Sequence, residues 1–339
     1  MAGKSDTGKS SHGQYLPTWL KFGIGGAIVV ASFYFLISRL VADWHQIPFD
    51  QLRFRPLPLA GSFALFILVH LPLYGYAWKL VLAGLGERMS FFRSSAIIAV
   101  TQLGKYVPGK VWFTLGRVSL ASREGIPVAK SLVSILVETG FALLSAVLLF
   151  GLAVLYVPRS GMPWSVYLLF LTVPMCLVVT YPPILNRVLA FLLRRFRQPV
   201  FRLSFSYLRL LSVLAVYTVD WVVQGIGAFL LINSYSVLPV SALPALVAGY
   251  SVSWILGFLF LLAPAGLGIR EGIYTFILDK MVQLGTRAGA STASLPLSIV
   301  SALVTRVWIT ASEAVLALAF ASFFSRTKGD KQRIDTDTR

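Results

Sequence analysis

Long uninterrupted apolar runs constrain this sequence more than any other feature. Six of them can be read along the chain, at about 19–41, 57–82, 128–156, 164–181, 208–232 and 295–324. A helix of roughly 20 residues crosses the hydrocarbon core of a bilayer, which is about 30 Å thick. Each run is close to that length, so each one predicts a transmembrane helix. The sequence therefore predicts an all-α polytopic membrane protein.

The composition supports this prediction. Of the 339 residues, 57% are hydrophobic and only 13% are charged, whereas soluble domains carry about 25% charged residues. A deficit of this size excludes an ordinary soluble enzyme, a disordered chain and a disulfide-rich secreted domain. The single cysteine, Cys176, lies inside an apolar run, and we expect it to be a small buried core residue.

Two further apolar stretches differ from the six runs because proline and glycine interrupt them. The first, 96–120, is broken at 104–110, and the second, 241–278, is broken at 264–268. Broken backbone is tolerated at membrane depth where protein or a polar cavity surrounds it. We expect both stretches to be re-entrant hairpins or pairs of half-helices. Ordinary turns between complete spanning helices are the alternative.

The basic residues predict the orientation. The net charge is +17, and short cytoplasmic loops of membrane proteins collect Lys and Arg. Three such residues lie in the first 21 residues, six in 88–123, six in 187–209 and five in 326–339, against five in all the intervening outer segments. Both termini are therefore predicted to be cytoplasmic, with a cytoplasmic tail at 1–18, a transmembrane domain at 19–324 and a basic tail at 325–339.

Two other charged segments allow a simple and a more specific interpretation. The segment 187–209, where Phe alternates with Arg, is either an interfacial amphipathic segment or a plain positive-inside loop. The segment 3–10 matches the phosphate-binding loop pattern, but no strand precedes it and no βαβ unit follows, so we assign no nucleotide binding to it. No cofactor, metal cluster or nucleic-acid module is predicted.

The first broken stretch has the features of an anion site. Pro108 is suited to begin a helix, and Gly109 would let a ligand approach the backbone. The helix that follows has a positive dipole end with Lys105 and Lys110 beside it, and Arg117 lies on the same face as Lys110. We therefore expect an anionic group to bind here.

The second broken stretch repeats the pattern. Small residues including Gly266 and Gly268 are followed by Arg270 and Glu271 in the first turn of a new helix. Each broken stretch precedes a predicted spanning helix that contains an acid, Glu138 in the first case and Glu313 in the second. We interpret this as a weak internal repeat whose copies have opposite orientations, a plan typical of secondary transporters.

Ionisable residues within the apolar helices are candidates for function, because each costs several kcal/mol to bury in a membrane. They are His70, Lys79, Glu138, Asp220, Arg306 and Glu313. Glu138 and Glu313 either form structural ion pairs with Arg306 or Arg270, or they act on a substrate or a proton. Lys79 is expected to reach the interface, and His70 to be a hydrogen-bonded interior residue beside Tyr74.

The expected cavity is basic. Its predicted members are Lys105, Lys110, Arg117, Arg270 and Arg306 against Glu138, Glu271 and Glu313, which leaves a net charge of +2. A phosphate-bearing head group would suit this charge.

The sequences of 104–112 and 264–272 together resemble the lysylphosphatidylglycerol synthase transmembrane-region family, also called the flippase-like family. The resemblance covers about 20–324 and implies a bacterial or archaeal lipid translocase of the cytoplasmic membrane. It places Lys105, Pro108, Lys110, Gly266, Gly268, Arg270 and Glu271 at the family's motif positions. The chain ends about fifteen residues after its last predicted helix, so we do not expect the aminoacyl-transferase domain of the best-known member.

These observations lead to one main functional hypothesis. We expect a lipid flippase for an anionic lipid or a polyprenyl-phosphate-linked sugar, working beside enzymes that build envelope lipids. A membrane-embedded glycosyltransferase and a small-solute transporter are the alternatives. The candidate acids for the first alternative, Asp43 and Asp50, lie in a short loop, which argues against it.

Overall fold

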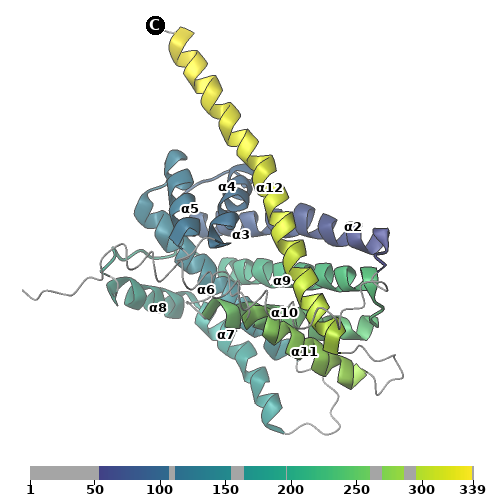
Figure 1. Cartoon of the computed structure of the whole chain (residues 1–339). Helices are drawn as coiled ribbons and strands as arrows, with labels where there is room; N and C mark the ends of the chain where they lie inside the picture. Colours follow the sequence, from purple (N-terminus) through teal and green to yellow (C-terminus); the bar gives the residue numbers. More distant parts are fainter. Residues whose placement is uncertain are drawn as a thin grey trace, which may run out of the picture.

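The computed structural model describes residues 53–106, 111–153, 164–195, 197–259, 269–285 and 295–337. Within these ranges the protein is a bundle of helices (Figure 1). The predicted helix at 19–41 and the phosphate-loop-like segment at 3–10 lie outside the described residues. Pro108, Gly109, Lys110, Gly266 and Gly268 also lie outside them, so the expectations for these residues stay predictions.

Long helices alternate with shorter ones along the chain. The long elements are α2 (Pro56–Leu65) with η3 (Phe66–His70) and α3 (Leu71–Gly84), α6 (Val128–Ala153), α9 (Tyr207–Tyr235) and α12 (Leu295–Asp337). The shorter elements are α4 (Phe91–Gln102), η4 (Leu103–Tyr106), α5 (Val111–Arg123), η6 (Trp164–Leu171), α7 (Thr172–Thr180), α8 (Pro182–Arg195), η7 (Val240–Ala242), α10 (Leu243–Leu259) and α11 (Ile269–Gly285). One of the short turns, η3, is π-helical and joins α2 to α3 without a break.

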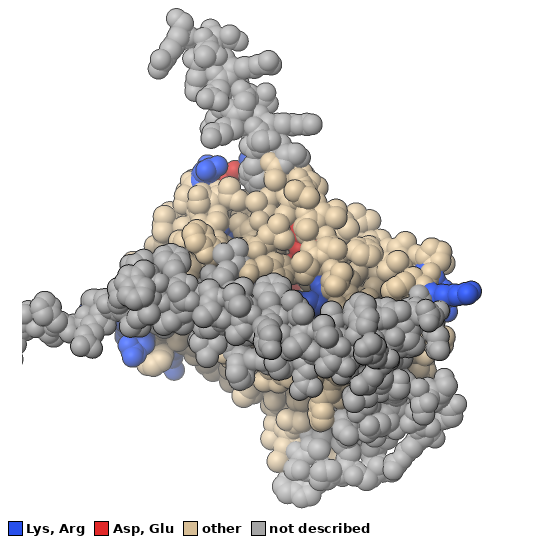
Figure 2. Space-filling model, viewed as in Figure 1, with Lys and Arg blue, Asp and Glu red and all other residues tan. Residues whose placement is uncertain are grey.

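Several of these elements are long and apolar enough to cross a bilayer. They are 56–84, 128–153, 207–235, 240–259 and 300–321, and four of the five coincide with predicted runs. The predicted run 164–181 is helical from 164 to 180 as η6 and α7, and it counts as a candidate span only together with α8, which follows at a bend of 81°. Figure 2 shows that most visible Lys and Arg residues lie at the edges of a largely uncharged surface. The chain is therefore a multi-pass all-α membrane protein.

Contacts between helix ends show which spans run in opposite directions. The N–H of Ser204, just before α9, donates to the carbonyl of Gly84 at the end of α3 over 2.9 Å. At the other end, the N–H of Arg55, just before α2, donates to the carbonyl of Ser234 in the last turn of α9 over 2.6 Å. The α2–α3 span and α9 are therefore antiparallel. We call the face with Gly84 and Ser204 the first face, and the face with Arg55 and Ser234 the second face.

The two interrupted elements enter the bundle from different faces. Hairpin 1 consists of α4, η4 and α5, and Lys130 after it pairs with Glu87 before it over 2.6 Å, next to the end of α3 at the first face. Hairpin 2 consists of α10 and α11. The hydroxyl of Tyr235 before it donates to Ser301 after it over 2.9 Å, at the second face. The predicted inverted arrangement is confirmed.

Each hairpin also packs against the long helix that follows the other hairpin. Besides its neighbours α3 and α5, α4 contacts α12, and α10 correspondingly contacts α6. The two limbs of each hairpin contact each other as well. Exchanging α3–α6 with α9–α12 therefore preserves the main contacts, as expected for an inverted repeat.

Gly104 allows the two limbs of hairpin 1 to approach each other closely. The described helical residues of the first limb end at Tyr106 and those of the second begin at Val111, and the part of the predicted interruption between them lies outside the described residues. A Cβ on Gly104 would lie 2.6 Å from the amide nitrogen of Phe113 in α5, so only glycine allows this close approach. In hairpin 2 the helical stretch 240–259 is long enough to span a bilayer and is thus longer than the half-helix we expected.

The core lies around α9 and α3. Buried side chains of α9 pack with α3 and α6 on one side, and with α6, α10, α11 and α12 on the other. Two serines of α6 are part of this core. Ser134 accepts a hydrogen bond from the indole of Trp78 (2.9 Å), and Ser145 accepts one from the indole of Trp221 (3.0 Å). These serines therefore stabilise helix packing instead of lining a hollow.

Candidate functional site

A polar cluster forms where the tips of the two hairpins meet α12. On α12, Arg306, Thr310 and Glu313 lie along one stripe. Tyr106 at the tip of hairpin 1 contacts all three: its hydroxyl donates to Glu313 (2.9 Å) and accepts from Thr310 (3.1 Å), and its ring lies 5.3 Å from the Arg306 guanidinium carbon. Hairpin 1 is thereby fixed to the helix that follows hairpin 2.

Lys105, the residue before Tyr106, binds the same carboxylate. Its Nζ lies 2.5 Å from Oε1 of Glu313. The carboxylate is buried, whereas the lysine side chain is 28% exposed. Of the two alternatives for Glu313, the structure shows an ion pair, and the partner from the tip of hairpin 1, Lys105, is one that we did not consider. This ion pair joins the two repeats.

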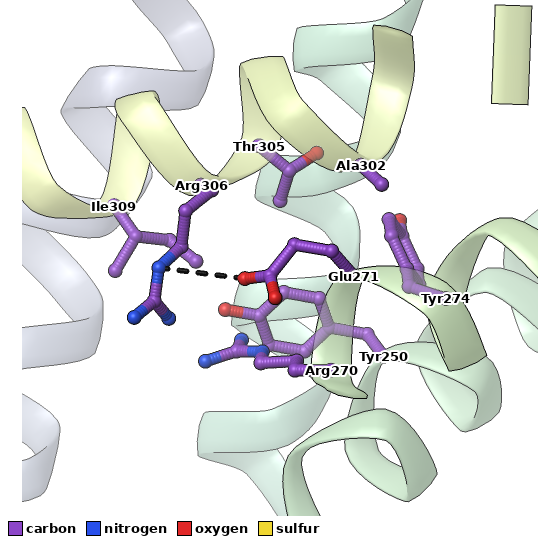
Figure 3. Close-up of a pocket in the computed structure, with 8 residues that line it drawn as sticks. All are labelled: Tyr250, Arg270, Glu271, Tyr274, Ala302, Thr305, Arg306 and Ile309. Carbon is purple, nitrogen blue, oxygen red and sulfur yellow. Dashed lines mark ion pairs between the residues drawn. The ribbon is translucent and has the colours of Figure 1, made fainter. Parts of the chain in front are cut away.

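Hairpin 2 contributes its first residues after the break. Glu271 lies 3.4 Å from Nε of Arg306, and the Arg270 guanidinium carbon lies 4.7 Å from the ring centre of Tyr250 in α10. Figure 3 shows these side chains converging beneath α12, together with Tyr274. Nη2 of Arg270 is buried and has no hydrogen-bond partner among the described residues. An unpaired buried donor is costly, so this position favours an acceptor ligand.

The space between these side chains is small. The pocket lined by Tyr250, Arg270, Glu271, Tyr274, Ala302, Thr305, Arg306 and Ile309 has a volume of about 10 Å³. That is the volume needed for about one water molecule. The conformation described here is therefore closed, and a head group would require the hairpins to separate. We expected a common cavity between the two broken stretches. In the described residues, their side chains contact each other there and leave only this small pocket.

The cluster carries a net positive charge. The described cations are Lys105, Arg270 and Arg306, and the carboxylates are Glu271 and Glu313. All five lie near the point where the hairpins meet, which leaves a charge of +1 before any contribution from Lys110. A buried net positive charge favours an anionic ligand.

The remaining two predicted residues form a separate pair. Arg117 in α5 bonds to Glu138 in α6, and both are buried. The guanidinium also lies over the rings of Phe113 (4.3 Å) and Trp78 (5.3 Å). Our expected partners for Glu138 were wrong, and this pair holds the second limb of hairpin 1 against α6. It belongs to the α3–α5–α6–α9 packing.

Two features of the site were missed from the sequence. Tyr106 joins three residues of α12, and Tyr250 supports Arg270, yet we singled out neither. The position of Tyr106 inside the motif, between Lys105 and Pro108, could have indicated it. Other expectations are confirmed: His70 is a hydrogen-bonded interior residue, and Cys176 is buried. Lys79 lies 5.9 Å from the ring centre of Tyr76.

Comparison with known protein families agrees with this architecture. Residues 19–305 match the family model described as the lysylphosphatidylglycerol synthase TM region. This range includes both hairpins and α12 as far as Thr305. A comparison with curated proteins gives no match.

Proposed function

The chain belongs to the lysylphosphatidylglycerol synthase transmembrane-region family, which indicates a function connected with membrane lipids, and we propose that it is a flippase for an anionic lipid. The head group would carry a phosphate, as in a phospholipid or a polyprenyl-phosphate-linked sugar. It would bind between the hairpin tips while its tails stay in the bilayer. The proposed activity is translocation and involves no covalent chemistry. Enzymes that build envelope lipids are the proposed source of the substrate.

The observation that carries this proposal is Nη2 of Arg270, a buried donor that has no hydrogen-bond partner in the part of the chain that the structure describes. The guanidinium of Arg270, at the start of α11, lies over the ring of Tyr250 in α10. The cluster around it already has more cations than carboxylates. A phosphate oxygen would satisfy the donor and neutralise the excess charge. Since hairpins 1 and 2 enter from opposite faces and meet here, separating them at one face or the other would give alternating access.

Leaflet exchange in proteoliposomes tests the proposal. Tail-labelled phosphatidylglycerol is the first probe, a labelled polyprenyl-phosphate sugar the second, and a bilayer-impermeant quencher reports the exchanged fraction. We compare wild type with Arg270→Gln and Glu313→Gln. Arg209→Gln is the control, because Arg209 is an exposed arginine at the start of α9 and touches none of these residues.

The expected result is rapid exchange with wild type and Arg209→Gln and a loss of at least tenfold with Arg270→Gln, since one charge-assisted hydrogen bond contributes about 1.5–3 kcal/mol. Equal exchange in all four proteins would contradict the site. Exchange equal to that of protein-free vesicles for every probe would contradict the function.

We also propose that the first face is cytoplasmic, as the distribution of basic residues predicts. Arg88 and Val237 are both exposed and lie next to the first and second faces. The native cysteine is buried, so it contributes little background labelling. An impermeant maleimide added to intact cells should label Val237→Cys and not Arg88→Cys, and inverted vesicles should reverse this. The opposite pattern would reverse the orientation.

A further inference from the structure

A histidine and an aspartate meet at the middle of the bundle, outside the site above. His70 is the middle residue of the span 56–84, and Asp220 lies at the middle of the span 207–235. These spans are antiparallel, so both residues lie at the same depth. Nδ1 of His70 is 2.6 Å from Oδ1 of Asp220. Their residues are only 6% and 2% exposed, so the pair is isolated from water.

The local backbone places His70 there. His70 is the last residue of the π-helical turn η3, directly before α3. Single π-turns within α-helices occur frequently at functional sites, because they change the direction of one side chain. On α9, Nε2 of Gln224 donates to the second oxygen of Asp220 over 3.0 Å, which fixes the carboxylate.

A chain of polar residues connects this pair with hairpin 1. Tyr74 lies one turn after His70, with 6.0 Å between the ring centres, and it lies close enough to Glu138 for the two groups to interact electrostatically. Glu138 in turn binds Arg117 of α5. The hydroxyl of Tyr217 adjoins the cluster and has no hydrogen-bond partner among the described residues. The pair is therefore linked to the second limb of hairpin 1.

The charge of this cluster depends on one proton. Its charged groups are the carboxylates of Asp220 and Glu138 and the guanidinium of Arg117. With a neutral imidazole the cluster has a net charge of −1, and one proton on His70 brings it to zero. Burying an uncompensated charge at the middle of a membrane is costly, and a proton on His70 would remove that charge. Histidine is the side chain that changes charge between pH 5 and 8.

This charge count includes the titratable groups that the neighbouring helices place around His70. The titratable groups around His70 are Asp220 and Tyr217 from α9, Tyr74 from α3, Glu138 from α6 and Arg117 from α5. The part of α12 near η3 contributes Trp308, which contacts Phe66. The charged residues in that part of α12, Arg306 and Glu313, are paired with Glu271 and Lys105. No described acid or base near the pair therefore already compensates the negative charge.

We propose that the His70–Asp220 pair binds and releases one proton in each transport cycle, which makes the protein a proton-coupled lipid translocase. The inference rests on the proposed flippase function and names its energy source. The proton enters from one aqueous side, forms the imidazolium of His70, and leaves to the other side when the pair is exposed there. A singly charged anionic lipid moved together with one proton transfers no net charge, so the membrane potential does not oppose it.

Coupling to the hairpin follows from the connections described above. Protonation of His70 would change the field at Tyr74 and Glu138, and with it the strength of the bond between Glu138 and Arg117. That bond holds α5, whose other end leads to the tip of hairpin 1. The proton can thus bias the equilibrium between closed and open positions of hairpin 1, as a ligand that distinguishes two states does.

A leaflet-distribution experiment tests the coupling. Vesicles of phosphatidylcholine containing tail-labelled phosphatidylglycerol receive wild type, His70→Gln, Asp220→Asn, Arg270→Gln or the control Arg209→Gln. Exchange is measured first at equal pH, and the steady-state ratio between leaflets is then measured under an imposed pH gradient, with and without a protonophore. Size-exclusion profiles and melting temperatures identify any variant that does not fold.

For one proton per lipid, wild type and Arg209→Gln should shift the leaflet ratio by up to about tenfold per pH unit, and the protonophore should abolish the shift. His70→Gln, which keeps a hydrogen-bond donor but no titratable ring, should give a ratio near one. If wild type exchanges lipid at equal pH but its leaflet ratio stays near one under the pH gradient, the proton coupling is overturned and the flippase function stands. A wild type without any exchange overturns both.

Discussion

Replacing Gly104 by alanine tests whether the closed hairpin 1 is the stable state. The new Cβ would lie 2.6 Å from the amide nitrogen of Phe113 and 2.8 Å from its Cα, whereas ordinary van der Waals contact starts at 3.4 Å. The start of α5 would therefore have to move by the difference, about 0.8 Å. Both obstructing atoms belong to the backbone, so no change of side-chain rotamer relieves the contact.

Overpacking of this kind usually costs about 1–3 kcal/mol. For a domain of a few hundred residues, 1 kcal/mol lowers the melting temperature by about 2–4 °C. We therefore expect Gly104→Ala to melt several degrees below wild type in detergent, as measured by scanning fluorimetry. The movement of α5 should also shift the tip residues Lys105 and Tyr106, so we expect slower lipid exchange in proteoliposomes.

Gly116→Ala is the matched control. Gly116 belongs to the same hairpin and faces α4, but its Cβ would lie 3.4 Å from the Thr101 methyl carbon, which is ordinary contact. Alanine is also the better helix former by about 1 kcal/mol. This variant should melt at or above the wild-type temperature. Equal melting temperatures for Gly104→Ala and Gly116→Ala would refute the close packing of η4 against α5.

Three further variants and one double variant test the ion pairs and hydrogen bonds. Glu138→Gln should destabilise the protein by about 3–5 kcal/mol because it leaves a buried guanidinium unpaired, and the double variant with Arg117→Met should melt closer to wild type. Tyr106→Phe removes a hydroxyl with two partners and should cost about 1–3 kcal/mol, seen as a lower melting temperature and slower exchange. Lys130→Gln removes a partly exposed ion pair and should change the stability by less than about 1 kcal/mol in the same melting experiment.

The sequence predicted the fold more completely than the site. Apolar length locates a spanning helix without any knowledge of its neighbours, so 57–82, 128–156, 208–232 and 295–324 are confirmed. We predicted the end of this run at Tyr181, next to the end of α7, but not the angle at which α8 follows it. Whether such a point bends by a few degrees or by 81° depends on packing, which the local sequence does not contain.

Ion-pair partners were harder to predict than the presence of buried charges. Glu138 and Glu313 occupy corresponding places in the two repeats, and we considered the same basic partners, Arg306 or Arg270, for both. The partners differ: Glu313 binds Lys105 from the other repeat, whereas Glu138 binds Arg117 from its own. Long side chains reach any carboxylate within several ångströms, so the choice depends on helix rotations that periodicity alone does not determine.

This difference between the repeats has a consequence for alternating access. The Lys105–Glu313 pair joins hairpin 1 to the helix that follows hairpin 2, so separating the repeats must break it. Its lysine is 28% exposed, and such a pair is weaker than a fully buried one. The Arg117–Glu138 pair lies inside one repeat and is fully buried, so the repeats can rock without breaking it, while its strength can still respond to the charge of the nearby His70–Asp220 pair. The weak pair therefore lies where movement is required, and the strong pair lies where rigidity is required. A phosphate between Lys105 and Arg270 could replace Glu313 as the counter-ion of Lys105, and ligand binding would then supply part of the free energy that opens the closed state.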